Sequence, residues 1–251
     1  MTTRTDHIAS FAKGLRVLEC FGADHPRLSV TEVARATGLD RATARRCLLT
    51  LQAEGYADHD GKFFTLTPRA LRLGMSALAS LPLPQIVQPW LDQLAEQIGQ
   101  SCSVAILDGG EIVYVARAAQ RRVMSIGLMP GSRLPAHCTS LGLVLLAALP
   151  DPEARAIVEA ADLTPRTPFS LTEPGAVMER IARARQEGYA IIDQEVETGL
   201  RSIAVPVTTA RGKVVAALNT GMAATQEEAQ SLAGRYLPAL QRVQAGLRRV
   251  L

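Results

Sequence analysis

The stretch from Leu28 to Thr67 constrains most strongly what this chain can fold into. It contains Ser29 followed three residues later by Glu32, a capping-box pattern that predicts a helix beginning at Val30. Gly38 can adopt a positive φ, so it can end that helix in a sharp turn. The pattern therefore predicts one short helix and an abrupt change of chain direction after it.

A second helix is predicted directly after that turn. Asp40 can cap it, and apolar residues then recur at helical spacing at Ala44, Leu48 and Leu51. No carboxylate occurs between Asp40 and Glu54, so the free face of this helix is basic. Two short helices around a glycine turn form a helix-turn-helix, whose second helix is shaped to enter the major groove of DNA.

A hairpin is predicted after the second helix. Asp60 and Gly61 stand between two strand-like runs, residues 56–59 and 62–66, and Asp-Gly is a strong two-residue hairpin signal. A hairpin in this place is the wing of a winged helix-turn-helix. The residues expected to contact DNA are Thr31, Arg41, Ala42, Thr43, Arg45, Arg46 and Lys62. The alternative is an interaction module that touches no nucleic acid, with an arginine face that is only solvated.

The charge distribution favours DNA binding by the N-terminal part. The chain has 251 residues, and its formal net charge is +3. Residues 1–80 contain 11 Lys and Arg against 8 Asp and Glu, whereas residues 81–251 contain 16 of each kind. The excess positive charge therefore accompanies the helix-turn-helix, where it can neutralise phosphates. An apolar fraction of 47% is ample for buried cores, and the length allows two domains.

Cysteine usage and hydropathy indicate where the protein works. The four cysteines are widely spaced within apolar runs, with no C-x-x-C and no histidine at metal-ligand spacing: Cys20, Cys47, Cys102 and Cys138. No apolar run reaches the length of a membrane span, and the N-terminus lacks the core of a signal peptide. We therefore expect a cytoplasmic protein that binds no membrane, with its cysteines reduced and buried.

Two further helices are predicted around the helix-turn-helix. Ser10 is expected to cap the first, whose inward face would consist of Phe11, Leu15 and Leu18. Thr67 and Pro68 are a cap and first residue for another, which runs to about Ser80. This helix is apolar on more than one side, so we expect it to pair with its own copy in a homodimer. The alternative is that it packs only on its own neighbours.

The Leu-Pro-Leu-Pro run at residues 81–84 is the best domain boundary. We expect a winged helix-turn-helix domain over residues 1–67, a linker helix over 68–82 and a second domain over 83–251. The second domain mixes helix and strand signals, which predicts an α+β fold with an antiparallel sheet flanked by helices. Its helices are predicted at Pro84–Ile98, Ser140–Leu149, Asp151–Ala161, Glu173–Glu187 and Thr225–Leu251. Its strands are predicted at Ser103–Leu107, Glu111–Ala116, Val123–Gly127, Tyr189–Asp193, Ile203–Thr208 and Val214–Asn219.

The second domain carries no convincing catalytic or metal motif. His137 and Cys138 are adjacent, but neighbouring side chains at a helix start diverge and form no dyad. Asp193, Glu195 and Glu197 alternate on an extended segment with no histidine nearby, and such carboxylates are more often solvated than bound to metal. No nucleophile elbow, phosphate-binding glycine loop or dinucleotide fingerprint is present. We expect no enzyme, no metal and no cofactor.

A ligand pocket is a better use for the polar positions of this domain. They collect at a helix start, a strand start and a strand end, and a helix start favours anions. Arg201 could supply a fork for a carboxylate, and apolar neighbours would complete a small-molecule cavity. For each residue alone, plain capping or sheet-end packing is the favoured interpretation, and only their grouping favours a site. The candidate effector residues are Ile126, Met129, Leu134, His137, Thr139, Ser140, Leu141, Leu200, Arg201, Ser202, Asn219 and Gly221.

Several of these motifs together resemble IclR-type bacterial transcriptional regulators. The N-terminal resemblance lies in residues 11–18, in the helix-turn-helix over 30–51 and in Asp60–Pro68. The second domain is similar through Gly131–Gly142 and Glu197–Pro206, and both of these motifs are specific. When residues 123–127 are included, the chain is similar to the subgroup of these regulators that controls protocatechuate and 4-hydroxybenzoate breakdown through the β-ketoadipate pathway.

The resemblance implies a winged helix-turn-helix joined by a linker helix to a GAF-like effector domain, in dimers or tetramers. The effector contacts that it implies fall on Leu134, Ser140, Leu141, Leu200, Ser202, Asn219 and Gly221. The expected function is therefore regulation of aromatic-acid catabolism genes through operator DNA, with a small aromatic carboxylate as effector. One alternative is a DNA-tethered enzyme acting on a small organic acid. Another is a structural DNA-associated protein that binds no ligand.

Overall fold

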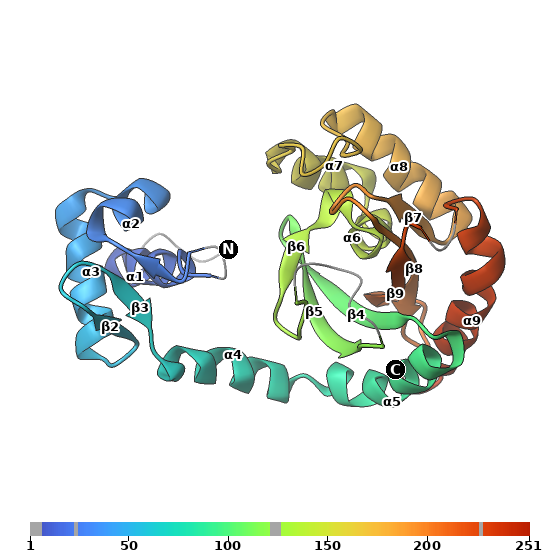
Figure 1. The fold of residues 1–251 in the computed structure, drawn as a ribbon, viewed down its shortest axis with the longest axis horizontal. Helices are drawn as coiled ribbons and strands as arrows, with labels where there is room; N and C mark the ends of the chain where they lie inside the picture. Colours follow the sequence, from blue (N-terminus) through green and yellow to red (C-terminus); the bar gives the residue numbers. More distant parts are fainter. Residues whose placement is uncertain (1–6, 23–24, 121–126, 226–227) are drawn as a thin grey trace. The chain divides into compact units, whose positions relative to one another are not determined.

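The computed structural model describes residues 7–22, 25–120, 127–225 and 228–251. The chain divides into two compact units, residues 1–80 and residues 81–251. Most helices and strands of both units are labelled in Figure 1. Among the helices described, none is both long and apolar enough to cross a membrane.

The first unit is a winged helix-turn-helix. Its elements in chain order are α1 Ala9–Glu19, β1 Arg27–Leu28, α2 Val30–Thr37, α3 Arg41–Ala53, β2 Ala57–His59, β3 Phe64–Leu66 and α4 Pro68–Ser80. The three strands pair antiparallel in the order β1-β3-β2, so β2 and β3 form the wing hairpin and β1 lies on its outer edge.

The local signals that predicted this unit are present in the structure. The Ser29 side chain accepts a hydrogen bond from the Glu32 backbone, and the Glu32 carboxylate accepts one from the Ser29 backbone at 2.7 Å. Gly38 has a φ of 68° and ends α2. The Asp40 carboxylate accepts from the Thr43 backbone at 2.8 Å and caps α3. The capping box, the turn glycine and the second cap are therefore confirmed.

The prediction for the first helix was wrong in its details. Helix α1 begins at Ala9 with Ile8 before it, so Ser10 lies inside the helix and does not cap it. Phe11 is 66% exposed and Leu15 is 42% exposed, whereas Val17 is fully buried. Only the last part of α1 packs on the core of this unit, which leaves the apolar residues of its first turns uncovered. That core consists of Val17, Leu28, Val33, Ala44, Leu48, Ala57 and Phe64.

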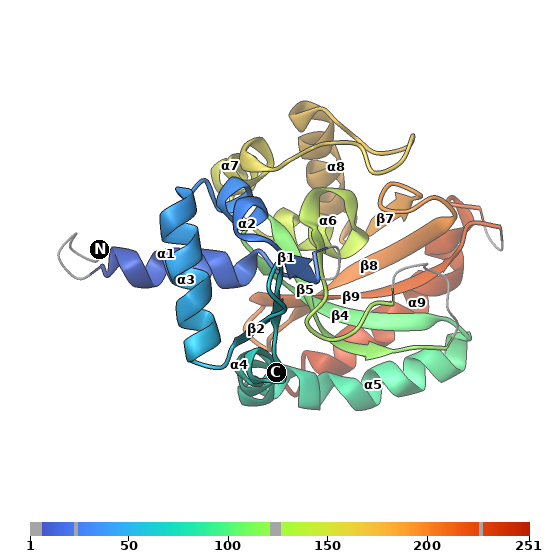
Figure 2. The ribbon, with the colours of Figure 1, turned by 60° about the vertical axis from the view of Figure 1, so that its left-hand side comes forward.

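The second unit is an antiparallel sheet with helices on both faces. Its strands are β4 Ser101–Asp108, β5 Glu111–Ala118, β6 Arg133–Pro135, β7 Ala190–Asp193, β8 Leu200–Thr208 and β9 Val214–Ala223, in the spatial order β6-β5-β4-β9-β8-β7. Its helices are α5 Pro82–Ile98, the 3₁₀ turn η1 Ala136–Cys138, α6 Ser140–Ala147, α7 Asp151–Ala160, α8 Pro174–Glu187 and α9 Ser231–Leu247. Figure 2 shows β4, β9 and β8 side by side in this sheet.

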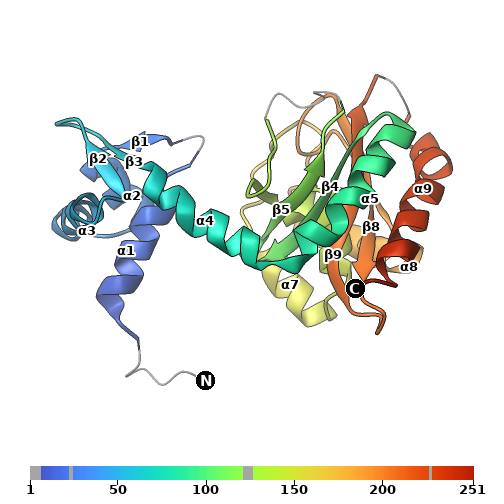
Figure 3. The ribbon, with the colours of Figure 1, turned by 90° about the horizontal axis from the view of Figure 1, so that it is seen from below.

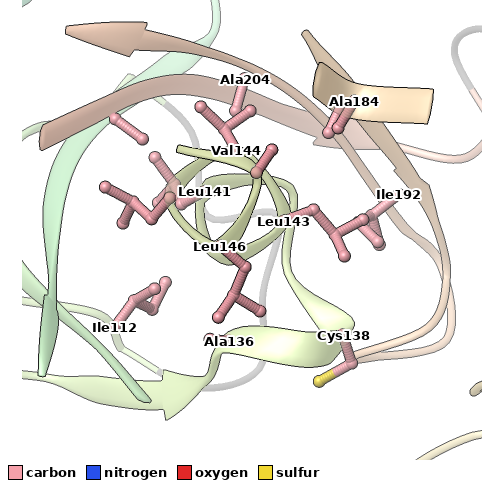
Figure 4. Packing of buried hydrophobic residues seen from close by; sticks show 14 of the residues in the cluster. Ile112, Ala136, Cys138, Leu141, Leu143, Val144, Leu146, Ala184, Ile192 and Ala204 are labelled. Atoms are coloured by element: carbon pink, nitrogen blue, oxygen red, sulfur yellow. The ribbon is translucent and has the colours of Figure 1, made fainter. Parts of the chain in front are cut away.

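The helices divide between the two faces of the sheet. Helices α5 and α9 pack on one face through β4, β5 and β8, as Figure 3 shows. Helix α6 packs on the other face and contacts β4, β8 and β9, with α8 behind it. All eight residues of α6 are buried, and Leu141, Leu143 and Leu146 point toward the sheet, β7 and η1 (Figure 4). The prediction of a core helix at this position is confirmed.

Several predicted boundaries in this unit differ from the structure. Helix α5 begins at Pro82, because prolines fit the first turn, where no intrahelical N–H is needed. Helix α9 begins at Ser231, later than predicted. Strand β8 begins at Leu200 and β9 extends to Ala223, so Ser202 and Gly221 lie within strands. The strand predicted at Val123–Gly127 falls largely on residues 121–126, which lie outside the described residues.

Candidate functional site

The free face of α3 is a basic surface. Arg41, Arg45 and Arg46 are exposed, while Ala44 and Leu48 on the opposite side are buried. No salt bridge occupies any of the three guanidinium groups within the described part of the chain. Of the other candidate DNA contacts, Thr31, Ala42 and Lys62 are exposed and Thr43 is half-buried. The surface is thus available to a polyanion such as the phosphate backbone of a duplex.

The caps at the start of each helix hold this surface in place. The pKa of the Asp40 carboxyl is lowered by hydrogen bonds with Thr43. The bond with the Thr43 side chain contributes most, and the bond with its backbone comes next. The side chain of Ser29 is the main cause of the lowered pKa of Glu32. Both carboxylates therefore stay ionised at neutral pH and stabilise the helix N-termini, where the helix dipole favours negative charge.

The second unit contains a cavity between α6 and the sheet. It is lined by Ser101, Tyr114, Arg117, Leu128, Leu134, Thr139, Ser140, Val196, Leu200, Ser202, Asn219 and Gly221. Its free volume is about 30 Å³, which is room for one or two water molecules. A ring-sized ligand can therefore enter only if lining side chains move.

Strand register places the polar lining residues together. Ser101 lies opposite Gly221, and Gly221 lies opposite Ser202 on the next strand. Two residues further along β4, Ser103 lies opposite Arg117 on β5 and Asn219 on β9. Residues opposite one another on neighbouring strands share a face of the sheet. Two cross-strand rows thus bring polar groups from four strands to the face that α6 covers.

A β-bulge aims Arg117 into the cavity. Val104 pairs with Ala116 but Ala105 pairs with Tyr114, so Val115 is an extra residue in β5. Without the bulge, Tyr114 and Arg117 would point to opposite faces, because side chains alternate along a strand. With it, both side chains line the cavity.

The electrostatics of the cavity favour an anion. Among the described lining residues, Arg117 is the only charged one, and none is acidic. The Arg117 guanidinium donates a hydrogen bond to the Ser103 hydroxyl at 2.9 Å. Burial raises the pKa of Tyr114 to about 12, so its phenol is neutral at physiological pH.

The first turn of α6 forms the opposite wall. Thr139 caps this helix, because its hydroxyl accepts from the Gly142 backbone at 3.1 Å. The Ser140 hydroxyl lies 2.7 Å from the Ser202 hydroxyl. The first backbone N–H groups of a helix have no intrahelical acceptor, and together with the helix dipole they favour an anionic group.

Seven of the twelve sequence candidates line the cavity: Leu134, Thr139, Ser140, Leu200, Ser202, Asn219 and Gly221. Ile126 lies outside the described residues. Met129 is 64% exposed, and Leu141 is fully buried in the hydrophobic core of the unit. Neither residue lines the cavity.

The structure also corrects the roles expected of Arg201 and His137. The Arg201 guanidinium binds both carboxylate oxygens of Asp193, at 2.6 and 3.2 Å, and donates to the Ala224 carbonyl at 2.8 Å. It is therefore committed to these partners and does not line the cavity. His137 is buried in η1 away from the lining, and burial is the main reason that its pKa is lowered.

Five lining residues were missed by the sequence reading: Ser101, Tyr114, Arg117, Leu128 and Val196. Ser101 and Ser103 alternate within an otherwise apolar strand, which is the period of one sheet face and could have indicated a polar site. Arg117 was missed because the strand was predicted to end one residue before it.

No metal centre is found in the described ranges, where no three His, Cys, Asp or Glu side chains gather as possible ligands. Asp193 and Glu195, considered as metal ligands, are instead ion-paired with Arg201 and Arg180. All four cysteines are free, and Cys102 and Cys138 are buried. Burial raises the pKa of these two thiols to about 12 and about 11, so neither is a nucleophile at neutral pH.

Two family models match the chain. A model of the IclR helix-turn-helix domain matches residues 10–61, which contain α1 to α3 and β2. A model of the C-terminal domain of the bacterial transcriptional regulator IclR matches residues 75–245. Together they include the basic surface of α3 and the whole lining of the cavity.

Individual relatives are similar along the same length. The chain is 41% identical over 236 residues to the Pca regulon regulatory protein of Pseudomonas putida, covering 94% of this chain and 81% of that protein. It is 40% identical over 251 residues to the p-hydroxybenzoate hydroxylase transcriptional activator of Acinetobacter baylyi, covering 98% and 93%. The second unit is similar to a crystal structure of the inducer-binding domain of a PobR double mutant from Acinetobacter with 3-hydroxybenzoic acid. That match has a TM-score of 0.63 and 35% identity, and covers 67% of this chain and 98% of that one.

Proposed function

The chain belongs to the IclR family of bacterial transcriptional regulators, and from that premise we propose that it controls genes of aromatic-acid breakdown. In this proposal α3 binds operator DNA and a small aromatic carboxylate enters the cavity under α6. Candidate effectors are 4-hydroxybenzoate and protocatechuate. The relatives support this class of ligand, since one is a p-hydroxybenzoate hydroxylase activator and the PobR domain holds 3-hydroxybenzoic acid.

The single observation that carries the effector class is the charge of the cavity. Arg117 is a cation in a lining that also includes the first turn of α6, with no acidic residue among the described lining residues. A guanidinium matches the geometry of a carboxylate. Leu128, Leu134 and Leu200 supply apolar wall for a ring, and the serine hydroxyls supply partners for a ring hydroxyl.

We propose that the DNA-binding surface consists of the α3 face, Thr31 and the wing residue Lys62. Guanidinium groups at the start of a recognition helix can read guanine or hold phosphates. The effector would bind one arrangement of the DNA-binding units more tightly than another, and this difference would change the affinity or geometry of operator binding. The coupling free energy between two such sites is typically ~1–3 kcal/mol.

We also propose that the chain acts as a homodimer, or as a dimer of dimers, on a palindromic operator. Leu71 and Leu73 on α4 are 65% and 53% exposed, and Phe11 on α1 is 66% exposed. A second copy of the chain can cover such apolar side chains through a two-fold interface, which matches a two-fold symmetric operator.

A ligand panel on the full chain tests the effector class. Melting temperatures are measured with 4-hydroxybenzoate, protocatechuate and the neutral analogue 4-hydroxybenzamide. A ligand that binds only the native state raises the free energy of unfolding by RT ln(1 + [L]/Kd). We expect the acids to raise the melting temperature and the amide to leave it unchanged. No shift with any aromatic acid, or an equal shift with the amide, contradicts the proposal, and recovery of chemically altered acid would indicate an enzyme.

A further inference from the structure

The outer face of the wing sheet carries a second basic feature, separate from α3. Leu28 on β1 lies opposite Phe64 on β3, and both side chains are buried. Side chains alternate along strands, so their neighbours Arg27 and Thr65, which also lie opposite one another, face outward. Phe63 precedes Thr65 by two residues and shares this outward face, diagonal to Arg27.

Two cations lie over the ring of Phe63. The Arg27 guanidinium carbon is 4.7 Å from the ring centroid, and the Lys62 ammonium nitrogen is 5.0 Å from it. An aromatic face attracts cations through its quadrupole, so the ring positions both groups. Arg27 comes from a strand that precedes the helix-turn-helix, whereas Lys62 comes from the wing turn.

The turn that carries Phe63 is held by backbone hydrogen bonds. One carboxylate oxygen of Asp60 accepts from the Lys62 backbone at 2.9 Å and from the Phe63 backbone at 2.7 Å. The Asp60 backbone N–H donates to the Phe63 carbonyl at 3.1 Å. These bonds lower the pKa of Asp60, with smaller contributions from nearby cations including Arg27. The ring is therefore presented from a fixed turn.

Among the described residues, the only acidic group that interacts with either cation is the Asp60 carboxylate, which interacts with Arg27 through space. Neither forms a salt bridge with an acidic side chain within the described ranges. Like charges gathered on one ring repel each other, and one anion between them would attract both and offset that repulsion. Asp58 on β2 lies opposite Thr65 on β3 and adds a negative charge at that side of the sheet. The basic part of this face is therefore confined to β1 and the turn.

We propose that Arg27 and Lys62, positioned by Phe63, together clamp a single backbone phosphate of the DNA duplex. The proposal rests on DNA binding by this winged unit and adds a contact from β1 to it. A phosphate oxygen accepts hydrogen bonds from both groups, and a phosphate contact contributes to affinity without reading sequence. Phe63 acts as a positioning residue and touches no base.

The salt dependence of DNA binding tests the clamp. The full chain and its R27A, K62A and R27A/K62A variants are titrated with operator DNA selected from a random library and with an unrelated duplex. Each phosphate contact contributes ~0.9 to the slope of log K against log salt. R27A and K62A each leave the other cation on the phosphate, so each should reduce the affinity for both duplexes, by on the order of fivefold at ~0.15 M salt, and the slope by less than ~0.9. Because both residues hold one phosphate, the double variant should lose ~0.9 of slope in total.

Variants at Phe63 separate positioning from folding. F63L keeps both charges and should weaken binding to both duplexes, whereas F63W restores a ring and should recover it. Melting temperatures of all variants are measured alongside, and R211A removes one exposed cation from the other unit as a charge control. An unchanged slope in the double variant overturns the clamp even when operator binding is intact, and a loss of ~1.8 in that variant shows two separate phosphates. Absence of DNA binding by the unsubstituted chain would instead overturn the proposed function.

Discussion

Ser140 and Ser202 share a hydrogen bond of 2.7 Å between their hydroxyl groups, although 62 residues separate them in the chain. The bond joins the first residue of α6 to β8 across the wall of the cavity. Ser140 is 1% exposed and Ser202 is 7% exposed, so water cannot easily replace either partner. Each hydroxyl keeps further hydrogen-bonding capacity that a ligand can use.

Removal of both of these hydroxyls should destabilise the chain by less than the sum of the two single removals. S202A leaves the Ser140 hydroxyl buried without this partner, which typically costs ~1–3 kcal/mol. The double variant S140A/S202A leaves neither unpaired, so its loss of unfolding free energy should be smaller than the sum of the single losses. Urea denaturation measures all three, with T198A as an exposed control. Strictly additive losses would mean that the two hydroxyls are not coupled.

Removal of the Arg117 charge should weaken the binding of aromatic acids. R117M keeps a long side chain but no donor, and a hydrogen bond to a charged group is worth ~1.5–3 kcal/mol. Calorimetric titration with 4-hydroxybenzoate should show a dissociation constant raised ~10- to 100-fold. R117K retains the charge without the planar fork, so it should bind with intermediate affinity. R133A, at an exposed ion pair outside the cavity, is the control, and unchanged binding by R117M would remove Arg117 from the site.

The winged unit was readable from sequence because its signals are local. Ser29 and Glu32 satisfy one another within a single helical turn, and Asp40 caps α3 through a residue three positions away. Such patterns need no knowledge of the remaining chain. The inward face of α1 was predicted wrongly. Contacts with α3, which is distant in sequence, decide which turns of α1 are buried.

The cavity was only partly readable because strand register decides its lining. The motif around Thr139 and Ser140 marked one wall correctly. The cation was assigned to Arg201, but Asp193 lies opposite it in the adjacent strand and takes its guanidinium. Arg117 enters the cavity only because Val115 bulges, and nothing in an apolar run of valines and alanines shows which residue will be extra.

An added methyl group at Gly142 should destabilise the second unit. A Cβ there would lie 2.1 Å from the Ala136 carbonyl oxygen, so α6 or η1 has to move. Overpacking of this kind costs ~1–3 kcal/mol. G234A is the matched control, because Gly234 on α9 has open space around its Cβ position, and alanine there should stabilise the helix by up to ~1 kcal/mol. Urea denaturation compares the two, and a G142A variant as stable as the unsubstituted chain would show that the α6–η1 contact is not tight.

The cap at Asp40 should make stability depend on pH in the acid range. Its pKa is lowered in the folded chain, so its contribution is fully present above the unfolded pKa of ~3.9 and is lost as pH falls through the folded value. D40N still caps a helix but does not ionise. Melting temperatures of the unsubstituted chain and D40N should therefore differ near pH 6 and converge as the pH falls through the lowered pKa of the folded chain. D58N controls for loss of one charge, and a difference that stays constant over this range would argue against an ionised cap.

Substitution of Arg45 or Arg46 should weaken operator binding, since both guanidinium groups project from the exposed face of α3. If an arginine reads a guanine, its alanine variant loses ~1–3 kcal/mol on the operator and discriminates less against an unrelated duplex. If it holds a phosphate, both duplexes weaken equally and the salt slope falls by ~1. Fluorescence anisotropy on both duplexes at several salt concentrations separates these outcomes, with R211A in the other unit as control. Operator affinity and selectivity equal to those of the unsubstituted chain in both variants would mean that α3 is not the recognition helix, because Ala44 and Leu48 are buried and leave α3 no second polar side.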